Sequence, residues 1–150
     1  MDLNQDLSDN FQLWEFVTSQ TASREGIDNT PPLQIVENLK KLCERILEPA
    51  RFALGPLRIS SGYRCTQLNK LVGGSATSGH PLGFCADVIP LKVSKMEFAR
   101  WISRNCKFDQ IILEFGKKDN PDWIHVSADP KSRNQVLQIL HGTGYVPVKL

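Results

Sequence analysis

The apolar residues change their spacing along this chain, and that change most constrains the fold. They first recur at intervals of three and four, the stripe of an amphipathic helix: Leu33, Val36, Leu39, Leu42, Cys43, Ile46 and Leu47. Later apolar runs, bounded by turn residues, predict strands at 57–61, 85–91, 108–115 and 123–128. Helices first and strands later favour an α+β fold, with an antiparallel sheet and flanking helices.

Proline and glycine mark the boundaries of the first half. Pro49 is expected to bend or end the first helix, because it lacks an amide proton and its ring clashes with the preceding turn. A brief helix at 65–72 is expected to stop at Gly73-Gly74.

Capping and turn signals mark the second half. Ser94, followed three residues later by Glu97, predicts a helix that begins there and runs to about Asn105. The polar segment 116–121 predicts a hairpin between the last two strands. Asp129-Pro130 predicts a final helix that ends at Gly142.

The length favours one domain over residues 1–150, since 150 residues with 41% hydrophobic content suffice for one core. Residues 1–30 carry several large apolar side chains, so we expect an ordered segment packed on that domain.

Charge and hydropathy exclude some partners. The net charge is +2 and the basic residues are scattered, which argues against nucleic acid. The start of the chain, Met1 to Asp6, lacks the features of a signal peptide, and no apolar run reaches membrane-spanning length. We therefore expect synthesis in the cytoplasm without a signal peptide and no membrane partner.

The four cysteines are Cys43, Cys65, Cys85 and Cys106. Their irregular spacing contains no Cys-x-x-Cys pair, so we expect reduced and mostly buried thiols. A domain stabilised by disulfides, without metal, is the alternative.

One segment, 78–87, brings together groups that bind metals. His80 and Asp87 stand seven residues apart around a glycine-containing turn and can face one ion. Hydrolytic zinc sites commonly have three protein ligands, and His125 is the best third candidate because a strand would hold it rigidly. His141 is expected at the surface or near a helix end. Taken singly, each of these residues is also compatible with an ordinary structural role.

Three blocks of this sequence resemble the zinc D-alanyl-D-alanine carboxypeptidases and related cell-wall peptidases, which share a fold with the Hedgehog signalling domain. Ser61-Gly62-Tyr63-Arg64 with Asn69 resembles the first motif. Residues 78–87 resemble Ser-x-His-x-x-Gly-x-Ala-x-Asp, with Cys85 in place of the alanine. Residues 123–126 resemble the closing Trp-x-His-x motif. A cysteine is small enough to pack at that alanine position, although its thiol can also react or bind metal.

The resemblance implies that His80, Asp87 and His125 bind Zn²⁺. It also places an acidic residue three positions before the last histidine, which makes Asp122 the first choice for the general base. Glu114 on the preceding strand is the alternative, because the register of the hairpin decides which of the two carboxylates reaches the site.

The resemblance also implies a substrate site. Arg64 is expected to hold the substrate and stabilise developing oxyanion charge. Ser78 is expected to bind substrate or orient its loop, and Tyr63 and Trp123 either line the cleft or only pack.

The expected function is zinc-dependent hydrolysis of a peptide bond in bacterial peptidoglycan, by a carboxypeptidase or an endopeptidase of the endolysin type. The missing signal suits a phage or prophage product that reaches the cell wall through a membrane lesion. A zinc-containing module that binds the wall or has a structural role, without catalysis, is the alternative.

Overall fold

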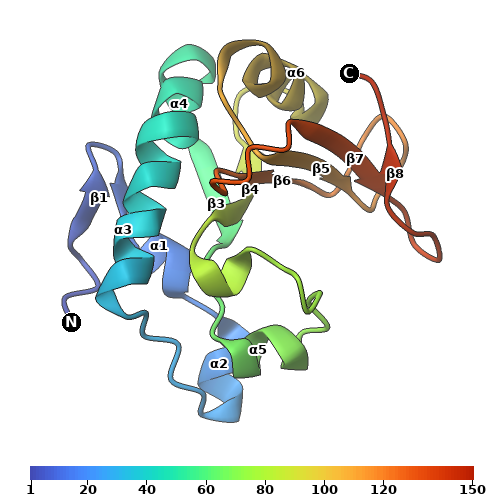
Figure 1. Cartoon of the computed structure of the whole chain (residues 1–150). Helices are drawn as coiled ribbons and strands as arrows, with labels where there is room; N and C mark the ends of the chain where they lie inside the picture. The colour runs from blue at the N-terminus through green and yellow to red at the C-terminus, as the bar shows by residue number, and fades with distance from the viewer.

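The computed structural model describes residues 1–150 and contains a column of helices beside a mixed sheet (Figure 1). The helices are α1 Leu13–Val17, α2 Gln20–Glu25, α3 Leu33–Leu42, the π-helix η1 Cys43–Leu47, α4 Glu48–Leu54, α5 Thr66–Leu71, the 3₁₀-helix η2 His80–Leu82 and α6 Lys95–Asn105. The strands are β1 Asp6–Ser8, β2 Phe11–Gln12, β3 Leu57–Ser61, β4 Cys85–Pro90, β5 Gln110–Glu114, β6 Trp123–Ser127, β7 Gln135–Ile139 and β8 Val146–Pro147. The predicted α+β class is confirmed.

The main sheet has six strands in the order β3-β4-β6-β5-β7-β8. Each pair is antiparallel except β5 and β7, which are parallel. The predicted hairpin is present, because β5 pairs with β6 across the turn that contains residues 116–121. The sheet is thus antiparallel as expected, apart from the one parallel pair β5 and β7.

The final helix predicted between Asp129-Pro130 and Gly142 is wrong. The segment forms a turn and then β7, whose residues Val136 and Ile139 pair in register with Ile111 and Glu114 of β5. Pairing with β5 supplies the backbone hydrogen bonds that a helix would have made internally. Tertiary pairing thus overrides a helical reading of a short apolar run.

The first helix continues past Pro49 and stays helical to Leu54, so of the two expectations at the proline, a bend or an end, the structure excludes the end. The preceding turn is a π-helix, in which the amide of Glu48 donates to the carbonyl of Cys43, five residues back. The wider turn accommodates a proline that an α-helical ladder would exclude. Gly55, with φ of 93°, then caps the helix.

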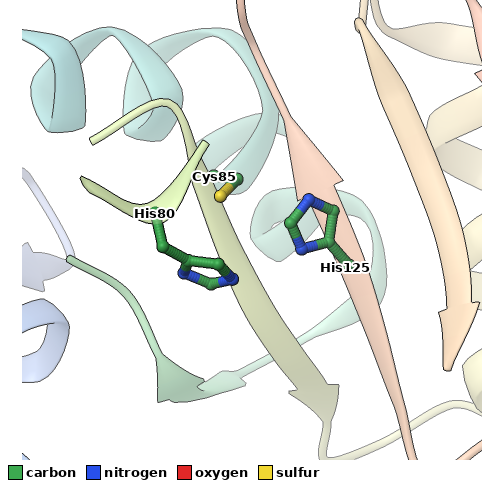
Figure 2. Close-up of side chains that lie close together, drawn as sticks. All are labelled: His80, Cys85 and His125. Carbon is green, nitrogen blue, oxygen red and sulfur yellow. The ribbon is translucent and has the colours of Figure 1, made fainter. Parts of the chain in front are cut away.

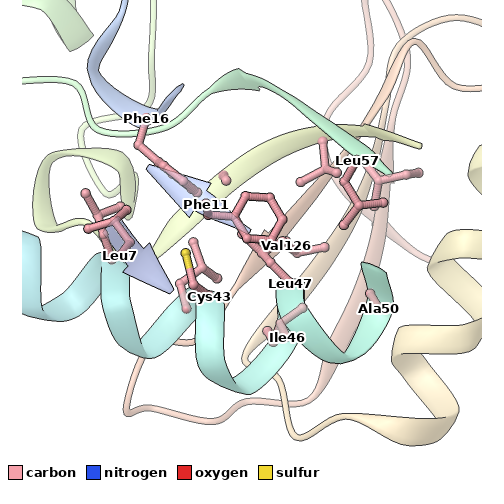
Figure 3. Close-up of a cluster of buried hydrophobic side chains, with 14 of the residues drawn as sticks. Leu7, Phe11, Phe16, Cys43, Ile46, Leu47, Ala50, Leu57 and Val126 are labelled. Atoms are coloured by element: carbon pink, nitrogen blue, oxygen red, sulfur yellow. The ribbon is translucent and has the colours of Figure 1, made fainter. Parts of the chain in front are cut away.

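A core of 25 buried residues lies between the helical column and one face of the sheet (Figure 3). The N-terminal segment contributes Leu7, Phe11 and Phe16 to this cluster, where they join Leu47 of η1 and Val126 of β6. The side chain of Asn29 donates to the carbonyls of Val17 and Tyr63, which ties the segment to the chain after β3. Residues 1–30 thus pack against the segment that leads into the site.

Strand alternation gives the sheet two chemically different faces. In β6, Ile124 and Val126 join the core, whereas His125 and Ser127 do not. In β4, Ala86 and Val88 join the core, and Asp87 between them points to the opposite face. That second face carries the polar residues described below.

None of the helices combines the length and the apolar content of a membrane span. The four cysteines are free thiols, with Cys43 and Cys85 fully buried.

Candidate metal centre

The pairing of β4 with β6 places Asp87 directly opposite His125. Oδ1 of Asp87 lies 3.0 Å from Nδ1 of His125, and both residues are buried. The side chains project from neighbouring strands of a packed sheet, so their separation is fixed by the backbone ladder.

His80 reaches the same carboxylate from η2. Its Nδ1 lies 2.5 Å from the carbonyl oxygen of Gly62, and a carbonyl only accepts, so Nδ1 carries the proton. Nε2 is therefore the nitrogen with a free lone pair, and it lies 3.5 Å from Oδ1 of Asp87. A backbone carbonyl behind the imidazole is the usual way in which a metal-binding histidine is oriented.

The glycines of the two motifs are explained by close packing. A Cβ at Gly62 would lie 2.6 Å from the carbonyl oxygen of Phe16, so only glycine permits this approach of α1. Gly83 has φ of 72°, and a Cβ there would lie 2.8 Å from the side chain of Ile35 in α3. The turn that carries His80 thus depends on these two glycines.

Cys85 begins β4 and lies between the two imidazoles (Figure 2). Ligand atoms of His80, Cys85 and His125 lie within 4.8 Å of one another, and so do those of Asp87, Glu114 and His125. The two groups share His125, so the site offers five donors in all.

The electrostatics of this group of side chains favour a positively charged group next to Asp87. Burial acts to raise the pKa of Asp87, but the neighbouring imidazole of His80 and the hydrogen bond from Nδ1 of His125 outweigh it and lower the pKa. Burial acts to lower the pKa of His125, but Cys85 and Asp87 outweigh it and raise the pKa to about 10. The ionised Asp87 therefore prefers a cationic neighbour.

The register of the hairpin places Glu114, rather than Asp122, in the pocket. Glu114 pairs with Trp123, so its side chain shares the face of His125, and Oε1 lies 3.8 Å from Nδ1 of that histidine. Trp123 also lines the pocket, and its Nε1 donates to Oε2 of Glu114 over 3.0 Å. Asp122 is exposed and lies outside the pocket, because strand alternation directs it away from this face.

Arg64 and Ser78 both line this pocket, which has a volume of about 450 Å³. The guanidinium of Arg64 donates to Oδ1 of Asn69 and to Oγ of Ser61, both neutral groups. Oγ of Ser78 accepts the amide of His80, so this serine orients the histidine turn. Tyr63 lies elsewhere: it is 8% exposed and belongs to the hydrophobic core, so it does not line the cleft.

Sequence reasoning missed several pocket residues. Tyr145, near the C-terminus, lines the pocket, although nothing near it in the sequence signals a site. Asp109 and Arg133 form an ion pair at 2.8 Å and also line the pocket. An aspartate at the start of a buried strand was the available signal, since such a carboxylate needs a partner. His141 is exposed and does not itself line the pocket, although its ring stacks on Phe115, which does.

A family model described as Peptidase M15 matches residues 9–127. The chain belongs to the M15 peptidase family. The match spans all three motifs and supports the predicted kinship with the zinc D-alanyl-D-alanine carboxypeptidases. The comparison with curated proteins gave no match.

The donors fit the metal that this family uses. Two buried imidazole nitrogens and a carboxylate held ionised form a common ligand set of hydrolytic zinc sites. The carbonyl of Gly62 behind His80 supplies the outer support that such a ligand requires.

Proposed function

We propose that this chain is a zinc peptidase that hydrolyses a peptide bond in bacterial peptidoglycan. One observation carries the proposal: Oδ1 of Asp87 lies within 3.5 Å of a ring nitrogen of both His80 and His125, in a pocket that also contains Glu114. Membership of the M15 family supports peptidase chemistry.

Zinc would be held by Nε2 of His80, the carboxylate of Asp87 and Nδ1 of His125. When bound, zinc supplies a Lewis acid that polarises a carbonyl and makes water more acidic. The three residues present these ligands from a turn and two paired strands. Nδ1 of His125 now donates to Asp87, so zinc would bind with release of that proton.

Glu114 is the proposed general base. Its Oε2 is held by the indole of Trp123, which leaves Oε1 on the side of His125 to take a proton from the attacking water. The same carboxyl then returns the proton to the leaving amine. Asp122 is replaced in this role because it lies outside the pocket.

Arg64 is the proposed partner of the substrate. Neither of its side-chain hydrogen bonds goes to a carboxylate, so its charge stays available for a carboxylate or an oxyanion. Ser78 contributes by fixing the turn that carries His80.

The peptidoglycan substrate is proposed from the family resemblance of the three motifs. Cleavage of a terminal D-alanine and cleavage of an internal bond are both compatible with this pocket. A phage or prophage setting, in which the chain acts on the cell wall, belongs to the same proposal.

A second candidate is a zinc-containing module without catalysis, which Cys85 favours. If its thiolate joined His80, Asp87 and His125, four protein ligands would close the coordination shell, as in structural zinc sites. A closed shell would leave no position for a water molecule.

Mass spectrometry of peptidoglycan digested by the purified protein tests the function. We expect new amines at one type of peptide bond with the wild type and none with His80→Ala. Zinc in the wild-type protein without any cleaved bond would instead support the second candidate.

A further inference from the structure

We propose that Arg133, held by Asp109, is a specificity-determining residue that recognises an anionic group of the peptide substrate. The inference rests on the proposed function, because it concerns the substrate of the same pocket. Arg133 lies on the turn between β6 and β7, a region that carries none of the family motifs.

Asp109 fixes the position of Arg133. It accepts the backbone amide and Nε of Arg133 on Oδ1 and Nη2 on Oδ2, at distances of 2.8 to 2.9 Å. The hydroxyl of Ser127 donates to Oδ2 as well, and the side chain of Asp109 is 1% exposed. A buried carboxylate with this many donors is an anchor whose own orientation is fixed.

The guanidinium keeps donors for a ligand. An arginine side chain has five N–H groups, and only Nε and Nη2 of Arg133 have a protein partner. The side chain is 39% exposed and lines the pocket that contains His80 and His125. The remaining N–H groups are therefore accessible from the substrate side.

The backbone around Arg133 is also unusual. Its neighbours Ser132 and Asn134 have φ of 47° and 56°, a region that residues other than glycine rarely adopt. Two such residues around one side chain indicate a turn built to present Arg133.

The ion pair of Asp109 and Arg133 lies where it could contact a substrate group beyond the cleaved peptide bond. Ser127, which bonds to Asp109, lies two residues after His125 on the same face of β6, a span of about 7 Å. A peptide covers this distance with about two residues. A carboxylate about two residues from the cleaved bond would therefore be within reach of Arg133.

Two carboxylates near Arg133 bear on how it could bind an anion. Asp109 neutralises one face of the guanidinium, and Asp129 also lines the pocket. Oδ1 of Asp129 accepts the amide of Lys131 within its own turn. Because these carboxylates offset the positive charge of Arg133, the direction of its remaining N–H groups, rather than the net charge of the pocket, would select the anion.

The test uses the zinc-loaded protein and a series of otherwise identical stem peptides, in which each carboxylate in turn is replaced by a carboxamide. We expect one replacement to lower kcat/KM of the wild type about tenfold, the value of a lost charge-assisted hydrogen bond. Arg133→Gln should cleave the acid form more slowly by a similar factor and no longer respond to that replacement. Arg104→Gln, an exposed arginine of α6, serves as the control and should discriminate like the wild type.

Two further variants separate recognition from folding. Arg133→Lys keeps the charge without the planar guanidinium and should discriminate between acid and amide substrates less strongly than the wild type. This variant keeps the test available if Arg133→Gln does not fold. Asp109→Asn should raise KM for the acid substrate more than it lowers kcat, because Asp109 acts only through Arg133. Equal discrimination between acid and amide in the wild type and the folded Arg133 variants would overturn the inference.

Failure of the proposed peptidase function can be distinguished from failure of the inference about Arg133. If the wild type cleaves no peptide in the series, binding of the same peptides still tests the inference. Preference of the wild type for the acid form, lost in the Arg133 variants, would support it, and equal affinity for both forms would contradict it.

Discussion

Asp87 and His125 are direct cross-strand partners, and Oδ1 of the aspartate lies 3.0 Å from Nδ1 of the histidine. The site is therefore an extension of the hydrogen-bond ladder between β4 and β6. His80 joins it from a turn held by the carbonyl of Gly62, so sheet and turn together fix the three proposed ligands.

Glu114→Gln is expected to lower kcat by about 10²- to 10⁴-fold, the usual loss when a general base is removed. The zinc content should not change, because Glu114 is not a proposed ligand. Asp122→Asn is the matched control and should retain activity, since Asp122 lies outside the pocket. Steady-state rates on a stem peptide check this, and a loss confined to Asp122→Asn would restore Asp122 as the base.

Cys85→Ala is expected to leave zinc stoichiometry and activity close to those of the wild type. The substitution introduces the residue of the family motif and removes a thiol that the proposed ligand set does not use. Cobalt substitution offers a spectroscopic check, because a thiolate ligand gives a near-ultraviolet charge-transfer band. A band present in the wild type and absent from the variant would make Cys85 a ligand.

Gly83→Ala is expected to destabilise the fold more than Gly142→Ala. Both glycines have positive φ, so each substitution costs about 1 kcal/mol from backbone conformation. At Gly83 the new Cβ would also clash with Ile35, which adds about 1 to 3 kcal/mol, whereas nothing lies within 4 Å at Gly142. Chemical denaturation measures both, and equal losses would show that the contact with α3 is unimportant.

Asp109→Asn is expected to lower stability at neutral pH and to matter less in acid. Burial acts to raise the pKa of Asp109, but hydrogen bonds from Arg133 outweigh it and lower the pKa below its ordinary value. A lowered pKa contributes stability above the unfolded value, near about 3.9, and that stability disappears as the pH falls through the folded value. The difference in unfolding free energy between wild type and variant should therefore shrink below about pH 4. A constant difference from pH 7 to pH 3 would contradict this.

Local patterns were sufficient to predict much of the fold. The predicted strand at 57–61 has those bounds in the structure, and Ser94 caps α6 by accepting the amide of Glu97. The helix did not end at Pro49, and no helix formed at 130–142, because neither a π-turn nor pairing with the edge of β5 has a local sequence signal.

The candidate site, like the fold, could be predicted only in part from the sequence. Motif spacing was sufficient to bring His80, Asp87 and His125 together as candidates, and the structure places them in contact. The choice between Glu114 and Asp122 needed the register of the hairpin, which depends on pairing across the sheet. Arg133 could not be foreseen, because its contact with Asp109 spans 24 residues and depends on the unpredicted strand β7.

Zinc content of purified protein, measured by elemental analysis, tests the proposed ligand set most directly. We expect about one zinc ion per chain in the wild type and in Asp122→Asn, and none in Asp87→Ala, which removes the carboxylate between the two imidazoles. Full zinc occupancy in a folded Asp87→Ala protein would contradict the assignment of His80, Asp87 and His125 as the metal centre.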